Sequence, residues 1–234
     1  MSIVDPARIW APRNAAPASS GEFVLYWMQV THRAHDNHAL NFAVEQANAL
    51  GVPVLVYHGL RHDYPWASDR LHTFIIEGVR DLVADFDARG IQYAFYLDRR
   101  ERGEHGSRDA SPLVQLAERS RLVVTDWFPT FLMPRQLKRL REKVAVPVVA
   151  IDSATVVPAQ LLEKQYSAAR WIRGDLMKRL DDWLHPVGGV EPEQRGPVGA
   201  RGRGGGGGEG GRGGGWGGGA GGRGPGVRGW GLGV

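Results

Sequence analysis

Short apolar runs alternate with helix-length amphipathic stretches through most of the chain. The runs are rich in Val, Leu, Ile and aromatic residues, a pattern typical of strands that are buried on both faces. Five such strands are predicted, at residues 23–28, 52–57, 91–97, 122–125 and 147–151. Because a helix-length segment separates each strand from the next, the order predicts a parallel sheet with right-handed crossovers.

The segments between the strands have helical spacing and helix-terminating residues. One helix begins at Asp36 or Asn37 and ends at Gly51. The clearest helix begins at Ser68 or Asp69, and its apolar residues recur at intervals of three and four: Leu71, Phe74, Ile75, Gly78, Val79, Leu82, Val83 and Phe86. Shorter helices are predicted over residues 112–117 and after Pro134. The predicted fold class is α/β, a five-stranded parallel Rossmann-like sheet with helices on both faces, followed by a disordered Gly/Arg-rich tail.

Composition divides the chain into four parts. Residues 1–21 are rich in Pro, Ala and Ser and are expected to form a loose N-terminal segment. Residues 22–160 contain the α/β pattern. Residues 161–187 form a linker and an amphipathic helix whose apolar face needs a partner. Residues 188–234 contain 25 of the 33 glycines. This tail is expected to be disordered, since it cannot bury enough apolar surface to offset chain entropy.

The tail allows two interpretations. Arginines in glycine-rich sequence, as in RGG segments, bind single-stranded nucleic acid. Alternatively, Gly, Arg, Ala and Pro are encoded by wholly G/C codons, so a shifted reading frame in GC-rich DNA produces the same mixture. Of the formal net charge of +4, the six arginines and three glutamates of residues 188–234 supply +3. The folded part is close to neutral, and this balance does not by itself identify a basic surface.

Two absences narrow the function classes. The chain has no cysteine, which excludes disulfides, thiolate metal sites and a thiol nucleophile. No apolar run reaches about 20 residues, the length that spans a bilayer, and residues 1–20 contain no apolar signal-peptide core. A cytoplasmic protein without membrane contact is the expectation.

The loops that follow the strands are the candidate site, because open parallel sheets bind ligands at the carboxyl ends of their strands. The loop after the first strand, residues 28–37, contains no glycine, and the chain has no Walker A or G-x-S-x-G sequence. These features argue against a dinucleotide fingerprint, a phosphate-binding loop and a serine nucleophile. His32, His35 and His38 are spaced by three but span a loop and a helix start, so no metal site is predicted.

Polar and aromatic residues at this edge each have two interpretations. Arg33, Asp36 and Asn37 either cap a helix or border a ligand pocket. Four aromatic residues either pack against a following domain or line a pocket for a planar ligand: Trp66, Trp127, Phe128 and Phe131.

Four motifs follow one another along the chain and together resemble one family. Residues 26–28 (YWM) and 33–40 (RAHDNHAL) are similar to the YWM and R-x-x-DN-x-AL of class II CPD photolyases. Residues 125–129 (TDWFP) with 134–136 (PRQ) resemble its TDFSP…RQ segment. Residues 152–158 resemble D-x-x-x-VVP, and residues 164–169 resemble K-x-E-Y-x-A, which leads into the flavin domain. The resemblance covers residues 22–184 and departs from the family at His38, usually Trp, and at Ala159 and Gln160, usually Cys-Trp.

The resemblance implies a deoxyribodipyrimidine photolyase, a carbon–carbon lyase that uses light to repair pyrimidine dimers in DNA. The family binds FAD in a helical carboxy-terminal domain that contains the catalytic residues. This chain turns to glycine and arginine where that domain should begin, so no catalytic residue is assigned and the chain alone is expected to be inactive. The family's α/β domain can hold an antenna chromophore, a folate or a deazaflavin. The implied antenna pocket is formed by Met28, Gln29, Asp36, Asn37, Asp126 and Trp127.

Two other functions stay open at this point. The chain could be a stand-alone α/β module that binds a nucleotide or another planar ligand. It could also bind nucleic acid through the arginines of the tail.

Overall fold

The computed structural model describes residues 2–12, 15–61, 64, 66–98, 111–130, 132–162 and 164–195. The predicted disorder of residues 196–234 lies outside the described residues, as do Phe131 and residues 99–110. No helix in the described part of the chain is both long and apolar enough to cross a membrane.

The sheet has six strands in the order β1-β6-β5-β2-β3-β4. The five predicted strands are confirmed as β2 (Phe23–Trp27), β3 (Val54–Arg61), β4 (Gln92–Asp98), β5 (Ser120–Asp126) and β6 (Val148–Ile151), and they are parallel. The predicted count of five was wrong by one. β1 (Ile9–Trp10) adds an antiparallel edge strand beside β6. A strand of two residues is too short to produce a periodic pattern.

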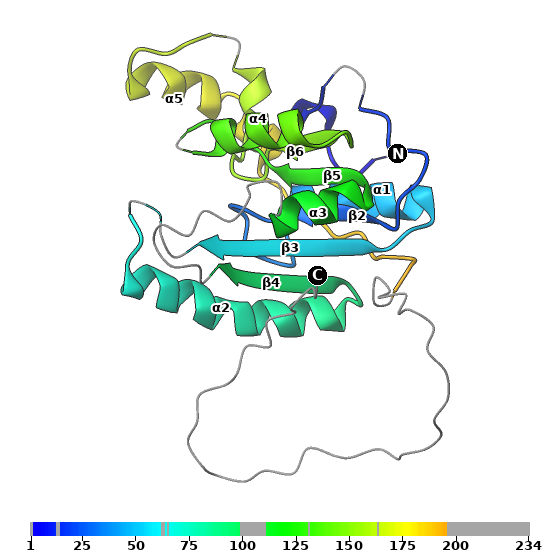
Figure 1. The fold of residues 1–234 in the computed structure, drawn as a ribbon. Coiled ribbons are helices and arrows are strands. Elements are labelled where there is room, and N and C mark those ends of the chain that lie inside the picture. The colour runs from blue at the N-terminus through cyan, green and yellow to red at the C-terminus, as the bar shows by residue number, and fades with distance from the viewer. Residues whose placement is uncertain are drawn as a thin grey trace, which may run out of the picture. The chain divides into compact units, whose positions relative to one another are not determined.

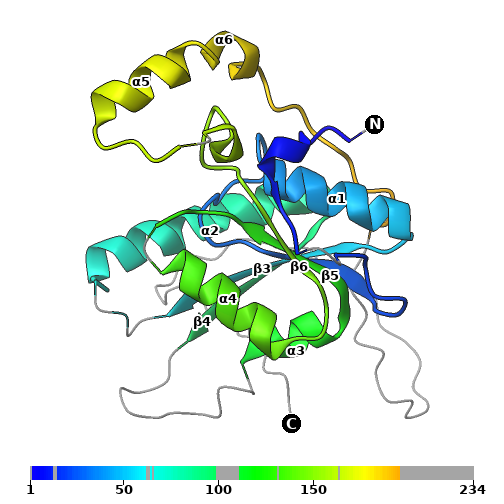
Figure 2. The same ribbon diagram turned by 90° about the horizontal axis from the view of Figure 1, so that it is seen from above.

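The described residues contain six α-helices: α1 (His38–Leu50), α2 (Asp69–Ala88), α3 (Pro112–Glu118), α4 (Met133–Lys143), α5 (Ala169–Met177) and α6 (Leu180–Trp183). Figures 1 and 2 show α1 and α2 on one face of the sheet and α3 and α4 on the other. The predicted helix starts are confirmed at Asn37 and Ser68, whose side chains accept hydrogen bonds from the backbone N–H of Leu40 and Leu71. Gly51 ends α1 in the left-handed conformation, with φ of 65°.

Alternate residues of the buried strands form two cores, one on each face of the sheet. Val24, Tyr26 and Val56 pack with α1 and α2, whereas Phe23 and Leu25 pack with α3 and α4. The predicted apolar face of α2 is only partly buried. Val79, Leu82 and Phe86 are buried in its C-terminal half, whereas Leu71, Phe74 and Val83 are exposed. 

The N-terminal segment is tied to the sheet rather than loose. Pro6–Arg8 forms a 3₁₀ helix, η1, whose last residue, Arg8, is buried and directly precedes β1. Its guanidinium donates hydrogen bonds to the carbonyls of Asp152, Thr155 and Val156. These bonds join the start of the chain to the segment that follows β6.

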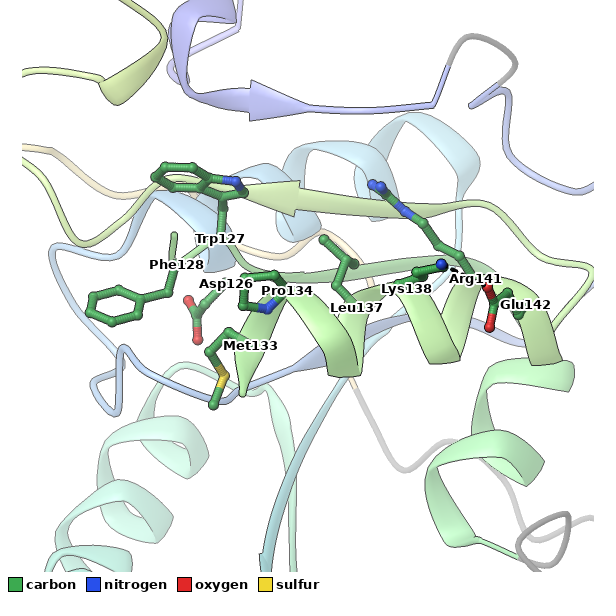
Figure 3. Close-up of a pocket in the computed structure, with 9 residues that line it drawn as sticks. All are labelled: Asp126, Trp127, Phe128, Met133, Pro134, Leu137, Lys138, Arg141 and Glu142. Atoms are coloured by element: carbon green, nitrogen blue, oxygen red, sulfur yellow. Dashed lines mark ion pairs between the residues drawn. The ribbon is translucent and has the colours of Figure 1, made fainter. Parts of the chain in front are cut away.

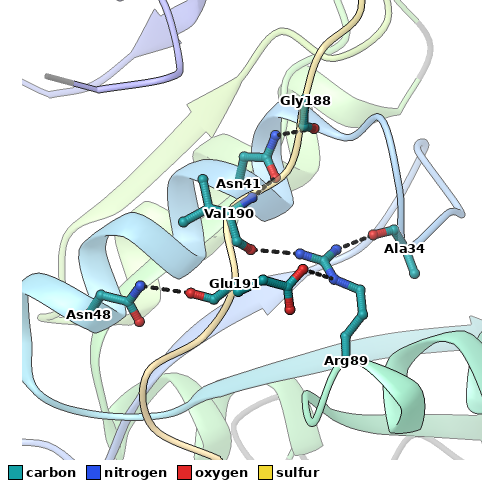
Figure 4. A network of polar contacts seen from close by, with 7 residues as sticks. All are labelled: Ala34, Asn41, Asn48, Arg89, Gly188, Val190 and Glu191. Atoms are coloured by element: carbon teal, nitrogen blue, oxygen red, sulfur yellow. Dashed lines mark hydrogen bonds and ion pairs between the residues drawn. The ribbon is translucent and has the colours of Figure 1, made fainter.

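Residues 188–195, which the sequence assigns to the tail, cross α1 in an ordered path (Figure 4). The Asn41 amide contacts the backbone of Gly188 and Val190, and the Asn48 amide contacts that of Glu191 and Glu193. We call residues 188–195 the strap. The ordered part of the chain therefore extends beyond the predicted boundary at residue 188.

Arg89, at the C-terminal end of α2, holds the strap against the loop before α1. Its buried guanidinium donates hydrogen bonds to the carbonyls of Ala34 and Val190, and it lies 3.6 Å from a Glu191 carboxylate oxygen. One side chain thus connects α2, the loop after β2 and the strap.

We expect Arg89→Ala to lower the free energy of unfolding by about 2 kcal/mol, because it leaves buried carbonyls without a donor. Urea unfolding of the full chain measures the change. Arg80→Ala, at an exposed position of α2, is the matched control and is expected to change stability by less than about 0.5 kcal/mol. Equal effects of the two substitutions would contradict the role assigned to Arg89.

His58 of β3 lies in an aromatic cluster at the carboxyl end of the sheet. Its Nδ1 is 2.7 Å from the Tyr93 hydroxyl of β4, and its ring packs edge-on against Phe95 and 4.3 Å from the ring of His32. Burial, with a smaller contribution from the neighbouring His32, lowers the pKa of His58 to about 3. The buried imidazole is therefore neutral in the folded protein near pH 7.

This neutral histidine makes stability depend on pH. Between pH 6.5 and about 3 the unfolded chain binds a proton at His58 that the folded chain does not, so stability falls as the pH falls through this window. Between pH 7.5 and pH 5 we expect His58 to contribute a loss on the order of 2 kcal/mol. Urea unfolding at both pH values should show that His58→Phe reduces this difference and that His35→Gln, at an exposed position, does not. Identical pH dependence of wild type and His58→Phe would refute the prediction.

Candidate functional site

The order of the strands reverses between β2 and β5, and their carboxyl ends form the topological switch point of the sheet. Ligands of open α/β sheets bind in the crevice at such a point. The loops after β2 and β5 meet here with the start of α1. These loops contain five of the six predicted pocket residues, and the sixth, Asp126, is the last residue of β5.

The carboxylate of Asp126, the last residue of β5, occupies this crevice. Its Oδ2 accepts hydrogen bonds from the backbone N–H groups of Gln29, Val30 and Thr31, at 2.9, 2.8 and 3.2 Å. Its Oδ1 is 3.0 Å from the hydroxyl of Tyr26. Three successive N–H groups that converge on one oxygen form an anion-binding nest, and here the anion is part of the protein.

Asn37 and Tyr26 complete the network behind Asp126. The Asn37 side-chain amide donates to the Tyr26 hydroxyl at 3.1 Å and to the carbonyls of Thr31 and Arg33. Burial, followed by the nearby Asp126 charge, raises the pKa of Tyr26 well above its usual value. The phenol is therefore protonated, so it donates to Asp126 while it accepts from Asn37.

Four predicted pocket residues come together at the switch point, but they fill it. Met28 is buried, and the Gln29 amide donates to the Thr125 hydroxyl at 2.8 Å. With Asn37 and Asp126, these residues satisfy one another. A ligand phosphate would have to displace the Asp126 carboxylate from its three N–H donors.

The other two predicted residues lie in two separate hollows. Asp36, with φ of 47°, borders a hollow of about 250 Å³ between the strap and Arg89, together with His35 and Asn41. Trp127 lines a second cavity on the opposite face of the sheet, which it shares with Asp126.

The second cavity has a volume of about 290 Å³ and lies along α4 (Figure 3). We call it the α4 cavity. Its lining is mainly apolar, with the charged residues Lys138, Arg141 and Glu142 toward the C-terminal end of α4. The lining residues are Asp126, Trp127, Phe128, Met133, Pro134, Leu137, Lys138, Arg141 and Glu142. The Trp127 indole also stacks on Trp10 of β1, with ring centroids 4.5 Å apart and planes 4° apart.

The α4 cavity presents a flat aromatic wall and a cationic end. Lys138 pairs with Glu142 at 3.8 Å, and Arg141 donates to the carbonyls of Trp10 and Val148. Such a cavity suits a planar ring with an anionic substituent. The sequence analysis proposed Trp127 and Phe128 as walls of a pocket for a planar ligand, but it assigned neither Trp10 nor the residues of α4 to such a pocket. Trp66, the other described member of the aromatic group, is exposed and does not line the cavity.

The three histidines that are spaced by three residues lie in different environments. His32 packs against His58, His35 borders the strap hollow, and His38 begins α1. Burial and the charge of Arg8 lower the pKa of His38 to about 4. Within the described ranges, no three His, Cys, Asp or Glu side chains are arranged to hold a metal ion.

Comparison with known proteins identifies the family. The model of the family described as DNA photolyase matches residues 24–186. The deoxyribodipyrimidine photo-lyase of Methanothermobacter thermautotrophicus is 33% identical over 189 residues, which cover 79% of this chain and 40% of that protein. The Arabidopsis thaliana enzyme of the same name is 29% identical over 74% of this chain and 34% of its own length. The chain thus spans less than half the length of these relatives.

Among solved structures, a universal stress protein from Archaeoglobus fulgidus aligns with 56% of this chain and 95% of its own, at 19% identity and a TM-score of 0.39. The family match extends over most of the α/β sheet and through α5 and α6. This chain belongs to the DNA photolyase family.

Proposed function

We propose that this chain is the α/β part of a deoxyribodipyrimidine photolyase, that it holds an antenna chromophore, and that repair of DNA requires a separate helical part with FAD. The observation that supports this division is the exposed apolar surface of α5 and α6. α5 has no buried residue, and Trp171, Met177 and Leu184 are 59%, 61% and 65% exposed. Amphipathic helices normally bury such side chains against a partner.

The longer relatives indicate what that partner is. The Methanothermobacter protein matches this chain over 40% of its length, so more than half of it has no counterpart in the alignment. The apolar surface of α5 and α6 lies at the C-terminal end of the matched region. We assign this surface to contact with the rest of a photolyase.

The described residues do not fit FAD. The two cavities described above hold about 290 and 250 Å³, near the lower end of the roughly 300–1,000 Å³ that pockets for drug-sized ligands occupy, and FAD is larger than such ligands. The flavin therefore belongs to another part of a photolyase.

The α4 cavity has room for one planar ring system, such as that of a folate or a deazaflavin, with the rest of the molecule outside it. Trp127 and Phe128 would contact the ring, and Lys138 would face an anionic substituent. When bound, such a group absorbs light and passes its excitation to a flavin. The role of the protein residues is to orient the ring and exclude water from it.

The runner-up function, a stand-alone nucleotide-binding module, is disfavoured by Asp126. In that function the N–H groups at the switch point would bind a phosphate. Here Asp126 already satisfies the N–H groups of Gln29, Val30 and Thr31.

The division into two parts predicts both an inactive chain and a defined docking surface. The full chain is mixed with the separately purified, FAD-containing remainder of the Methanothermobacter photolyase. Calorimetry measures binding, and a dimer-containing oligonucleotide under blue light measures repair. We expect no repair by the chain alone, a complex with the remainder, and binding at least about tenfold weaker for Trp171→Glu, because it buries a charge at the interface.

Phe74→Glu is the matched control, since Phe74 is an equally apolar, exposed residue on the distant α2. It should bind like wild type, and both variants should keep wild-type unfolding curves. Light-dependent repair by the isolated chain, or equal loss of binding in both variants, would contradict the proposal.

Asp126 provides the test between the two candidate functions. We expect Asp126→Ala to lower the free energy of unfolding by about 3 kcal/mol, because three buried N–H groups lose their acceptor. Added acetate or phosphate should restore part of that stability in the variant by entering the emptied nest. Wild type and the exposed control Asp36→Ala should show no such anion dependence. A thermal shift of wild type with ATP would instead support the nucleotide-binding module.

A further inference from the structure

Helix α4 concentrates positive charge on one face of the molecule. Five of its eleven residues are cationic and one is acidic: Arg135, Lys138, Arg139, Arg141, Lys143 and Glu142. We propose that the exposed side of α4 binds the phosphate backbone of duplex DNA without regard to sequence. This inference needs neither a chromophore nor a flavin, so it stands apart from the proposed function.

The cations of α4 differ in what they contact within the protein. Arg141 donates to the carbonyls of Trp10 and Val148, and Lys138 pairs with Glu142. Arg135 and Arg139 are exposed, and neither has an acidic partner within 4.0 Å among the described residues. Their guanidinium groups are available to a ligand in solution.

Arg135 and Arg139 lie one turn apart on the same side of the helix. A spacing of four residues separates them by about 6 Å along the axis, and Lys143 extends the row to about 12 Å. Each strand of a DNA duplex presents a phosphate about every 3.4 Å along its axis. A straight row of this length can therefore contact several phosphates of one backbone.

The opposite face of the sheet has the opposite charge. There, α2 contains five acidic residues and two arginines, whereas α4 lies with α3 on the other face (Figure 2). The near-neutral total of the folded part therefore conceals two faces of different sign. A polyanion would be attracted to the α4 face and repelled by the α2 face.

The surface chemistry of α4 favours a nucleic-acid backbone over other anionic partners. Leu137 and Leu140 pack toward the sheet, and no exposed large apolar residue of the described chain lies on α4. Membrane-surface helices need an apolar face to insert, and stable protein interfaces need an apolar or aromatic centre. Cations without apolar anchors are what binding to a phosphate backbone requires.

The test compares two double variants of the full chain with the same change in net charge. Arg135→Gln with Arg139→Gln alters α4, and Arg70→Gln with Arg80→Gln alters exposed arginines of α2. Fluorescence anisotropy of a labelled 20-base-pair duplex measures binding between 50 and 200 mM salt. We expect the α4 variant to bind roughly tenfold more weakly at 50 mM salt, with a salt-dependence slope smaller by about two. The α2 variant should stay within about twofold of wild type.

Three results would overturn the proposal. Equal weakening in both variants would show an effect of net charge alone. Unchanged binding in the α4 variant would assign DNA binding to other residues, including the arginines beyond residue 195. Wild-type binding to vesicles of anionic phospholipid or to poly-glutamate as tight as binding to DNA would replace the nucleic acid with another partner. Matching circular dichroism and melting curves of the variants exclude a folding defect.

Discussion

The buried carboxylate of Asp126 is the interaction on which this fold depends. A desolvated charge is costly unless hydrogen bonds compensate it, and here three backbone N–H groups and a phenol do so. The bonds fix the loop after β2, and that loop positions Asn37, which caps α1. The start of the helix and the closed switch point are therefore parts of one network. This is why the polar residues expected to surround a ligand stabilise the domain instead.

The elements that local sequence encodes were predicted well. The five parallel strands are continuous apolar runs, and Asn37, Ser68 and Gly51 act as helix boundaries through contacts within a few residues. β1 and the strap could not be predicted this way, because they depend on distant partners. Arg8 bonds to carbonyls more than 140 residues away, and Arg89 bonds to Val190, 101 residues away. No local periodicity reports such contacts.

The candidate site shows a different limit. Sequence reasoning located Met28, Gln29, Asn37 and Asp126 together, but residue type alone does not say whether a polar group meets a ligand or another protein group. The sequence prediction included Trp127 of the α4 cavity but not its other wall, because that wall comes from a helix that follows the strand. The net charge of the folded part also gave no sign of the separate charges of α2 and α4. The near-neutral sum is made of an acidic α2 and a basic α4, which only the placement of the two helices on opposite faces separates.

The strap bears on how the glycine-rich tail arose. The composition changes from globular to glycine-rich at residue 188, and a shift of reading frame near that residue is one explanation of the change. Yet Gly188, Val190 and Glu191 make specific contacts with Asn41, Asn48 and Arg89, side chains that belong to the matched α/β region. Most of these contacts use backbone N–H and carbonyl groups of the strap, which any sequence presents. Only the pairing of the Glu191 carboxylate with Arg89 depends on residue type. The contacts therefore explain why the strap packs on the domain, whereas the position of a frame change is a question for the gene sequence.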